Sequence, residues 1–205
     1  MGKLEANKQQ KLTSLLNTAF NLFTTQGVTK TSIAEISQKA CIAKGTFYLY
    51  FKDKYDIRNR LISHESSKLF KNAVADLEEF SKEKNEQLGF EEKIIFIINH
   101  IVDELNSNQT LLTFISKNLS WGIFKEALTT KVASDDINFK DVYYEMINAE
   151  DISLEEPEIM LFLIVELVSS TCYSAILYKE PADIDTIKPY LFKTVRAIIR
   201  EHTIR

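Results

Sequence analysis

A basic and aromatic run from residue 44 to residue 54 carries side chains whose types and spacing suit contact with DNA. The run is Lys44-Gly45-Thr46-Phe47-Tyr48-Leu49-Tyr50-Phe51-Lys52-Asp53-Lys54. Lysines attract phosphates, threonine and tyrosine hydroxyls donate to phosphate oxygens or base edges, and a glycine permits close approach of the backbone. We expect Lys44, Gly45, Thr46, Tyr48 and Tyr50 to form the outward face of this segment.

The elements around this run predict a helix-turn-helix. Ser32-Ile33-Ala34-Glu35 has the capping-box pattern that begins a helix, and the chain turns at Cys41-Ile42 before a second helix from Lys44 to Tyr50. The second helix of such a motif enters a major groove about 12 Å wide, and the first helix braces it. The apolar residues with the spacing for that brace are Ile33, Ile36, Ala40, Ile42, Phe47 and Phe51.

The charge of the chain is divided between a basic beginning and an acidic remainder. The net charge is −4. Residues 1–60 carry ten Lys and Arg against four Asp and Glu, which leaves +6, and residues 61–205 carry −10. This asymmetry favours a nucleic-acid-binding head on an acidic body, although the overall charge would not suggest one.

The scarcity of glycine and proline, together with helical periodicity, predicts an all-α fold. Gly and Pro together make up 8 of 205 residues, which disfavours a β-protein with many tight turns. Apolar residues repeat at three- and four-residue steps in about ten segments. Besides the two helices above, we expect helices at residues 8–26, 54–82, 90–105, 110–118, 120–132, 138–148, 158–178 and 184–202. We expect two domains, a helix-turn-helix domain over residues 1–55 and a larger helical body over residues 56–205.

The head resembles the TetR family of bacterial transcription regulators. The residues that carry the resemblance are Thr31-Ser32-Ile33-Ala34-Glu35-Ile36 and the run from Lys44 to Lys54, and it extends over about residues 10–60. It implies that Lys44, Thr46 and Tyr48 lie at the groove. It also implies that Thr31, Ser32, Tyr50 and Lys54 hold phosphates, and that movements of the body reach the DNA through Lys54.

Two positions depart from the family pattern. Cys41 stands at the turn where the family usually has glycine, and a non-glycine residue in the left-handed region costs roughly 1–2 kcal/mol. Ala43 stands where Ser or Thr often caps the recognition helix, and losing a cap costs about 1 kcal/mol. Both departures concern where the second helix begins. Cys41 is also a candidate redox sensor, although a lone thiol is more often a packing residue.

The resemblance further implies an inducer pocket in the body, and aromatic and interrupted apolar segments supply candidates for it. A polar side chain inside an apolar run is costly to bury without a partner, so His100 and Glu166 are better pointers than aromatics, whose ordinary role is packing. Glu166 has three open roles: facing a cationic ligand, pairing across a dimer, or lying at a solvated helix edge. The candidate ligand-binding residues are Phe96, His100, Phe114, Trp121, Tyr144, Glu166 and Tyr173.

The last two predicted helices are apolar on more than one side. Such a surplus face favours a protein partner, and the resemblance implies a homodimer through the helices near 158–178 and 184–202 that reads a near-palindromic operator. The longest apolar stretch, Ile159 to Val168, is ten residues long and contains Glu166. A membrane span needs about 20 apolar residues. We therefore expect a cytoplasmic protein with no membrane partner, and the N-terminus lacks the apolar core of a signal peptide.

Patterns for catalysis or metal binding are missing from the sequence. His64-Glu65-Ser66-Ser67-Lys68 begins like a zinc-protease motif but ends in Lys, and there is no GxSxG, P-loop or GxGxxG. We expect no enzyme, no metal and no cofactor. The predicted function is a DNA-binding transcription regulator, a repressor released by a small-molecule effector. The alternatives are a regulator controlled by a protein partner or without ligand control and, more remotely, a helical carrier or enzyme.

Overall fold

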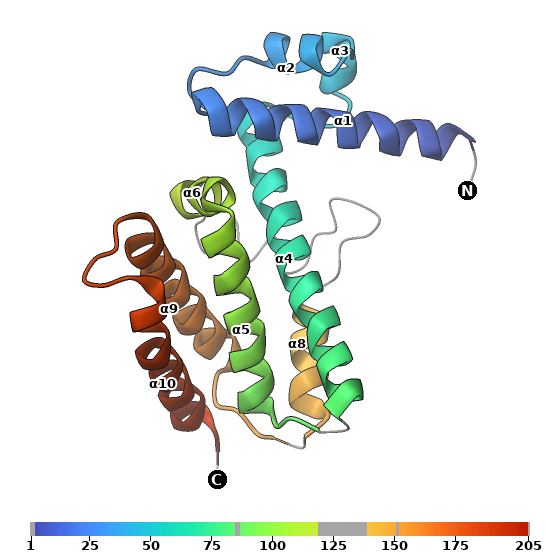
Figure 1. Ribbon diagram of the computed structural model, residues 1–205. Coiled ribbons are helices and arrows are strands. Elements are labelled where there is room, and N and C mark those ends of the chain that lie inside the picture. Colours follow the sequence, from blue (N-terminus) through green and yellow to red (C-terminus); the bar gives the residue numbers. More distant parts are fainter. Residues whose placement is uncertain (1–2, 85–86, 119–138, 151, 205) are drawn as a thin grey trace. The chain divides into compact units, whose positions relative to one another are not determined.

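The computed structural model describes residues 3–84, 87–118, 139–150 and 152–204 (Figure 1). Every regular element within these ranges is an α-helix, apart from one isolated antiparallel bridge between Leu154 and Thr203. The predicted all-α class is therefore confirmed. The described residues form two compact units, one that contains residues 3–66 and one that contains residues 67–117 and 139–204.

The first unit contains α1 (Lys3–Gln26), α2 (Ile33–Lys39), α3 (Lys44–Phe47) and the beginning of α4 (Lys54–Lys84). Helix α1 packs against α2, and α2 packs against α3. Helix α1 ends where predicted, because Gly27 adopts φ +84° and its amide donates to the Phe23 carbonyl at 3.1 Å.

The predicted brace lies in the core of this unit. Ile36, Ala40, Phe47 and Phe51 are buried, and the Phe47 and Phe51 ring centroids are 5.4 Å apart. Ile33 and Ile42 are only half-buried. Helices α1 and α4 complete the core with Leu15, Leu16, Ala19, Leu22, Phe23, Ile57, Leu61 and Ile62. Because burying each large apolar side chain contributes about 1.5–3 kcal/mol, this small core holds α3 firmly in place.

The second unit has a core shared by the later part of α4 with α5 (Phe90–Ser107) and α8 (Phe139–Asn148). The buried residues of this core are Phe70, Ala73, Leu77 and Ile97, and Phe96, Phe139, Val142 and Met146 are among those that pack against them. The rings of Phe70 and Phe139 have centroids 3.9 Å apart. Helix α6 (Gln109–Asn118) follows α5.

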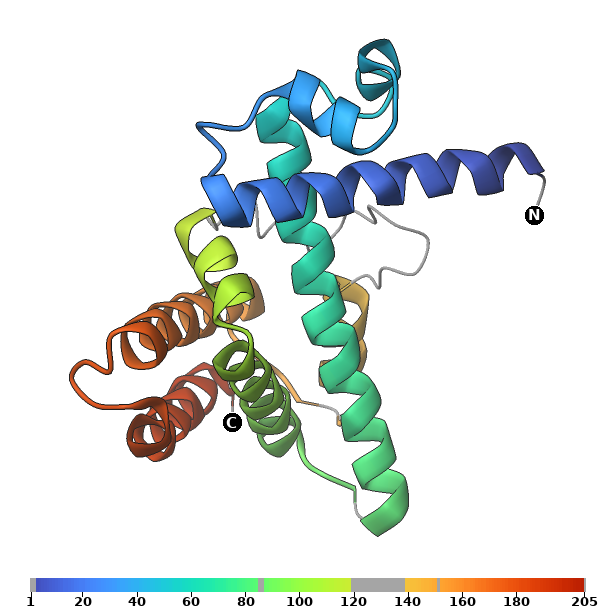
Figure 2. The same cartoon turned by 45° about the horizontal axis from the view of Figure 1, so that its top comes forward.

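Helices α9 (Pro157–Leu177) and α10 (Ile184–His202) pack against each other and against α5 (Figures 1 and 2). Pro157 lies in the first turn of α9, as predicted. The Asp183 carboxylate caps α10 by accepting from the Thr186 amide at 2.9 Å, and this bond lowers the pKa of Asp183.

Two helix boundaries differ from the sequence-based expectation. Helix α3 ends at Phe47 rather than Tyr50, because the next amides form tighter turns, with Leu49 donating to Thr46 and Tyr50 to Phe47 at 3.1 and 3.0 Å. Helix α1 begins at Lys3 rather than Lys8. The helix expected at 120–132 lies outside the described residues.

Helix α9 corrects the expectation that no segment is long and apolar enough to span a membrane. It has 21 residues, and its most apolar window has a mean hydropathy of 1.9. The apolar character continues past Glu166, because Ser and Thr interrupt it only mildly. Length and composition alone are weak evidence for a span, since the core helices of soluble bundles pass the same test. A third of that window is buried, and α9 packs against α5 and α10.

Candidate nucleic-acid interface

The turn between α2 and α3 has the geometry that its sequence predicted. Cys41 adopts φ +57°, so a non-glycine residue does occupy the left-handed region, and its side chain is exposed. The Ile42 amide donates to the Ser37 carbonyl at 2.9 Å and closes the turn. Ala43 is the N-cap residue of α3 and makes no side-chain cap. The two departures are thus real features of this head, with a local cost of about 1–2 kcal/mol at the turn.

Helix α3 presents an exposed face beyond the brace. Lys44 and Gly45 are exposed, Thr46 is half-buried, and Tyr48 is 51% exposed with its ring edge-on to Phe47. An added Cβ at Gly45 would meet no atom of the chain within 4 Å. Packing among the described residues therefore gives Gly45 no reason to lack a side chain.

The remaining predicted phosphate contacts fall into two groups. Ser32 is exposed, and its hydroxyl oxygen accepts from the Glu35 amide at 3.1 Å, so its hydrogen can still donate to a phosphate. The Tyr50 hydroxyl donates to the Lys8 carbonyl of α1 at 3.3 Å. Thr31 is 1% exposed and donates to the Gly27 carbonyl at 2.9 Å. In this structure Ser32 keeps a hydroxyl hydrogen to donate, whereas the hydroxyl groups of Tyr50 and Thr31 donate within the head. All three phosphate contacts stay predictions.

Lys54 uses its ammonium group inside the head. The Nζ atom donates to the carbonyl oxygens of Val28, Thr29 and Thr31 at 3.0, 3.0 and 3.2 Å. A lysine ammonium has three N–H donors, so these three carbonyls occupy all of them. In this DNA-free structure the Lys54 side chain joins α4 to the turn between α1 and α2, and its predicted contact with a phosphate stays a prediction.

The first turn of α4 is capped by carboxylates. Asp53 accepts from the amides of Tyr55 and Asp56 at 2.7 and 2.9 Å, and the Asp56 carboxylate accepts from the Lys52 amide at 2.8 Å. Asp53 is therefore the side-chain cap of α4. These contacts also neutralise the positive end of α4, so cationic side chains rather than this helix end must supply attraction for phosphates.

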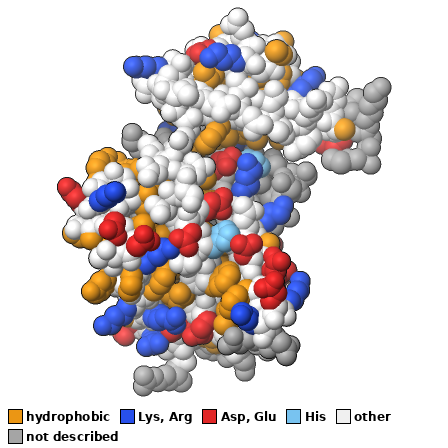
Figure 3. All heavy atoms as spheres, viewed as in Figure 1, with side chains coloured by type: hydrophobic (Ala, Val, Ile, Leu, Met, Phe, Trp, Pro, Cys, Tyr) orange, Lys and Arg blue, Asp and Glu red, His pale blue; other side chains and the backbone are white. Residues whose placement is uncertain are grey.

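Cations and aromatic rings lie together on the head. The Tyr55 ring is 50% exposed and lies 5.6 Å from the Lys54 ammonium and 5.4 Å from the Arg58 guanidinium. On the face shown in Figure 3, the lysine and arginine side chains around α1–α3 lie next to hydrophobic ones. A basic surface interleaved with apolar groups suits both phosphate contact and van der Waals contact with bases.

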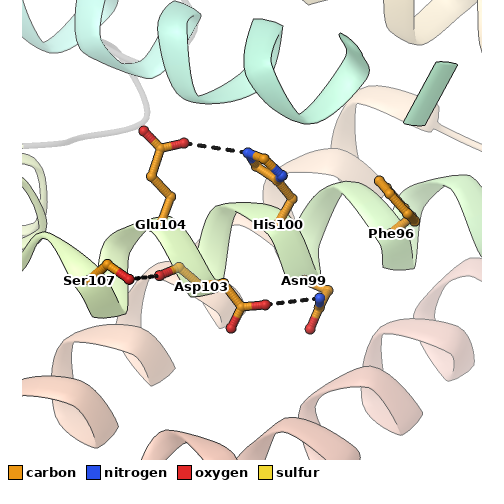
Figure 4. Close-up of a pocket in the computed structure, with 6 residues that line it drawn as sticks. All are labelled: Phe96, Asn99, His100, Asp103, Glu104 and Ser107. Atoms are coloured by element: carbon orange, nitrogen blue, oxygen red, sulfur yellow. Dashed lines mark hydrogen bonds and ion pairs between the residues drawn. The ribbon is translucent and has the colours of Figure 1, made fainter. Parts of the chain in front are cut away.

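The second unit has an open groove along α5 with a volume of about 400 Å³ (Figure 4). Its lining residues are Phe96, Asn99, His100, Asp103, Glu104 and Ser107. In Figure 4, Asn99 and Asp103 point away from the side on which His100 and Glu104 meet. The groove brings two of the predicted ligand-binding residues together, Phe96 and His100.

His100 lies between two carboxylates. Its Nδ1 is 2.9 Å from Asp76 Oδ2 of α4, and its Nε2 is 3.5 Å from Glu104 Oε2 of α5. On the other side, Asp103 accepts from Asn99 at 3.0 Å and pairs with Lys188 of α10. The groove therefore offers carboxylates and an aromatic ring, a lining that suits a cationic or neutral polar molecule better than a polyanion.

The other predicted ligand-binding residues are not among the lining residues of this groove. Phe114 is buried in α6, and Tyr144 is half-buried in α8 with its ring edge-on to Tyr143. Glu166 is exposed on α9, and the Tyr173 hydroxyl is 3.0 Å from that of Tyr178. Trp121 lies outside the described residues.

Comparisons with known proteins agree with the geometry of the head. The family model for "Bacterial regulatory proteins, tetR family" matches residues 15–61, which include α2, the turn and α3. The transcriptional regulator AcrR of Shigella flexneri is 38% identical over 55 residues. That match spans 27% of this chain and about a quarter, 26%, of the length of AcrR. Residues 15–61 therefore match the helix-turn-helix segment of the TetR family.

Solved structures of other regulators share the fold of this chain. FadR from Bacillus subtilis, solved in complex with stearoyl-CoA, has a TM-score of 0.61 and 17% identity and covers 91% of this chain and 98% of its own. FadR from Bacillus halodurans has a TM-score of 0.61 and 15% identity, over 89% and 96% of the two chains. At these identities the likeness extends to the fold alone. The match of residues 15–61 to a family of transcription regulators agrees with the expectation that the chain is not an enzyme.

Several residues of this TetR-family head and body escaped the sequence analysis. Leu49 is 82% exposed beside Tyr48, and Tyr55 and Arg58 form the cation–aromatic cluster on α4. Asp76 is the α4 partner of His100. Leu49 does not fit the spacing of the brace residues, so its exposure could have been predicted from the sequence. The pairing of Asp76 with His100 joins residues 24 positions apart, so no local pattern could reveal it.

Proposed function

We propose that the protein is a transcription regulator that binds a near-palindromic DNA operator as a homodimer and is released from it by a small-molecule effector. The observation that carries the DNA-binding part is the exposed face of α3 on a buried aromatic brace, within the segment that matches the family model. The head is basic, with a net charge of +6 over residues 1–60. DNA binding therefore weakens strongly as salt increases.

Contacts with bases and phosphates divide along α3. Lys44, Thr46 and Tyr48 are the proposed groove contacts, and Gly45 permits the backbone to approach. The exposed Leu49 suits an apolar contact with a thymine methyl group. Ser32 at the beginning of α2 is a proposed phosphate contact.

Helices α9 and α10 are the proposed dimer interface. Ile159 and Leu163 on α9 and Tyr190 on α10 are 50%, 43% and 71% exposed. Large apolar side chains exposed on adjacent helices favour association with another chain, and a two-fold dimer presents two recognition helices to successive major grooves. On this proposal Glu166, which is exposed on α9, lies at or beside the interface.

The α5 groove is the proposed effector site. His100 joins α5 to α4 through Asp76, and α4 is one continuous helix from Lys54 to Lys84. An effector that separates His100 from Asp76 removes a contact that holds α4 to α5. The change in DNA affinity then equals the coupling free energy, typically 1–3 kcal/mol.

Fluorescence polarisation tests the DNA-binding proposal. Wild type, Tyr48→Ala and the control Tyr178→Ala, which alters an exposed tyrosine of the second unit, are titrated at about 150 mM salt with DNA flanking the protein's own gene and with a scrambled duplex. Selective binding that Tyr48→Ala loses and Tyr178→Ala keeps is the expected result. If no selective sequence emerges even from a random DNA pool, the proposal fails.

A thermal-shift screen followed by DNA release tests the effector proposal. Cationic and neutral polar compounds form one set, and stearoyl-CoA forms a second, because the similar FadR of Bacillus subtilis was solved with it. We expect release by a compound of the first set, and its loss in His100→Ala. Release by stearoyl-CoA alone contradicts the proposed site. Binding without release by any compound favours control by a protein partner or no ligand control.

A further inference from the structure

Helix α1 is longer than the core that it helps to form, and Figures 1 and 2 show it running past α2 and α3 toward its N-terminus. It has 24 residues, so it is about 36 Å long. Every side chain from residue 5 to residue 14 is exposed or half-buried, and the first buried one in this stretch of α1 is Leu15. This part of α1 therefore contributes little to the core. We call residues 3–11 the α1 extension.

A cation lies in the α1 extension where the packed face of α1 would continue. That face is a stripe at steps of three and four residues, made of Leu12, Leu15, Ala19 and Leu22. One step earlier the stripe reaches Lys8 instead of an apolar residue, and Lys11 lies one turn away from Lys8. Both lysines are exposed, and neither forms an ion pair with a described residue. Their charges are therefore available to a partner outside the chain.

Two hydrogen bonds hold this part of α1 beside the helix-turn-helix. The Tyr50 hydroxyl donates to the Lys8 carbonyl at 3.3 Å, and Ser14 Oγ donates to the Ala40 carbonyl at the end of α2 at 3.2 Å. Tyr50 is itself a predicted phosphate contact. Because a lysine side chain has a long and flexible stem, the ammonium group of Lys8 can reach a phosphate that lies beside Tyr50.

The charge of the α1 extension favours a polyanion as its partner. Residues 3–11 carry Lys3, Lys8 and Lys11 against Glu5, which leaves a net charge of +2. Glu5 lies in the first turn of α1, where a carboxylate stabilises the positive end of the helix. Duplex DNA beyond the base pairs read by α3 is the polyanion that the proposed function brings to this side of the head.

We propose that the α1 extension is a second DNA contact, in which Lys8 and Lys11 bind phosphates that flank the base pairs read by α3. This inference rests on the proposed DNA-binding function. It assigns the extension a role in affinity and not in the choice of sequence, because phosphate contacts do not read bases directly. A helix that continues from a packed one needs no new nucleus, so the extension is formed before DNA binds and little conformational entropy is lost.

The salt dependence of operator affinity tests the number of contacts. The variant Lys8→Gln/Lys11→Gln removes both charges from each head, and glutamine favours a helix as much as lysine does. Four such contacts in a dimer contribute about 3.6 to the slope of log K against log salt. We expect the slope to fall by at least about half that value between about 50 and 300 mM salt. Lys84→Gln, an exposed lysine at the end of α4, is the matched control and should keep the wild-type slope.

Trimming the operator tests where the contacts lie. Polarisation binding is measured with duplexes that lose one base pair at a time from both ends, down to the base pairs that selection from a random DNA pool fixes. We expect the affinity of the wild type to fall in a step of at least about fivefold when the flanking phosphates are removed. Lys8→Gln/Lys11→Gln should lack this step, whereas Lys8→Arg/Lys11→Arg should retain it. A step or a salt slope that is unchanged in the glutamine variant overturns the proposal.

These outcomes separate the inference from the proposed function. If the wild type selects no DNA sequence, the DNA-binding proposal fails, and this inference fails with it. If the wild type selects an operator and the glutamine variant keeps both its slope and its step, only the inference fails. Circular dichroism first checks that each variant keeps its helical content. If the double variant does not fold, Lys8→Gln and Lys11→Gln are measured singly, and each should lose about half of the change in slope.

Discussion

Residues of α3 and the two residues that follow it have exposed surface that the fold of the chain does not explain. Gly45 has ordinary helical backbone, and an added Cβ there would touch nothing. Tyr48 and Leu49 keep about half or more of their surfaces exposed although they adjoin a buried aromatic brace. Neither the helix nor the core requires these choices.

The Gly45→Ala substitution tests whether the glycine serves DNA binding rather than folding. Alanine favours a helix interior over glycine by about 0.5–1 kcal/mol, and no atom obstructs the new methyl group, so the variant should be equally or more stable to unfolding. The same methyl group obstructs close approach to DNA. We therefore expect operator affinity to fall at least about tenfold while the melting temperature stays constant or rises.

Polarisation binding and calorimetric melting of the same samples check this prediction. Ala34→Gly, an exposed position on α2, is the reverse control. It should lower the melting temperature and affect DNA affinity less. Unchanged operator affinity in Gly45→Ala would contradict the proposal that Gly45 permits close approach of the backbone to DNA.

At the scale of elements, α5 and α10 are joined by an ion-pair network as well as by apolar packing. The Glu91 carboxylate of α5 accepts from Arg200 Nε and Nη2 at 2.9 Å each and from Arg196 Nη1 at 2.5 Å. These hydrogen bonds and charges, Arg200 first, lower the pKa of Glu91. The network fixes the register of α10 along α5.

The lowered pKa has a direct consequence for stability. A carboxyl group whose pKa is lower in the folded state than in the unfolded state stabilises the fold above the unfolded value, about 4.3, and loses that contribution as the pH falls through the folded value. Glu91→Gln should therefore cost about 1 kcal/mol of unfolding free energy at pH 7 and much less near pH 3. Urea titrations at both pH values measure this. Glu79→Gln, an exposed position on α4, serves as control, and an equal loss at both pH values would contradict the ionic origin.

At the scale of the whole molecule, the exposed apolar side chains of α9 and α10 are the feature that a single chain does not explain. Leu163→Glu places a charge on this surface, so on the proposed dimer we expect it to abolish self-association at concentrations where the wild type associates. Operator affinity then falls steeply, because two linked heads bind far more tightly than one.

Sedimentation velocity and polarisation binding measure these two effects. Ile204→Glu is the matched control, because Ile204 is 57% exposed near the end of the chain and lies outside α9 and α10. A Leu163→Glu variant that remains a dimer would exclude this part of α9 from the interface.

Sequence by itself determined the features that depend on neighbouring residues. Gly27 ends α1, Ser32 begins α2, Asp53 caps α4 and Pro157 opens α9, because each acts on backbone groups within a few residues of itself. The aromatic brace was also predictable, since helical periodicity assigns side chains to faces. These local rules sufficed for the helix-turn-helix and for the resemblance to its family.

Only the tertiary structure decided what the polar side chains do. Lys54 finds three carbonyls 23 to 26 residues away, Thr31 is buried beneath the turn, and His100 meets Asp76 from another helix. Hydrogen bonds and ion pairs act over a few ångströms in space, whatever the separation along the chain. A sequence pattern can therefore name the groups able to bind DNA or a ligand, but the fold determines which of them are already occupied.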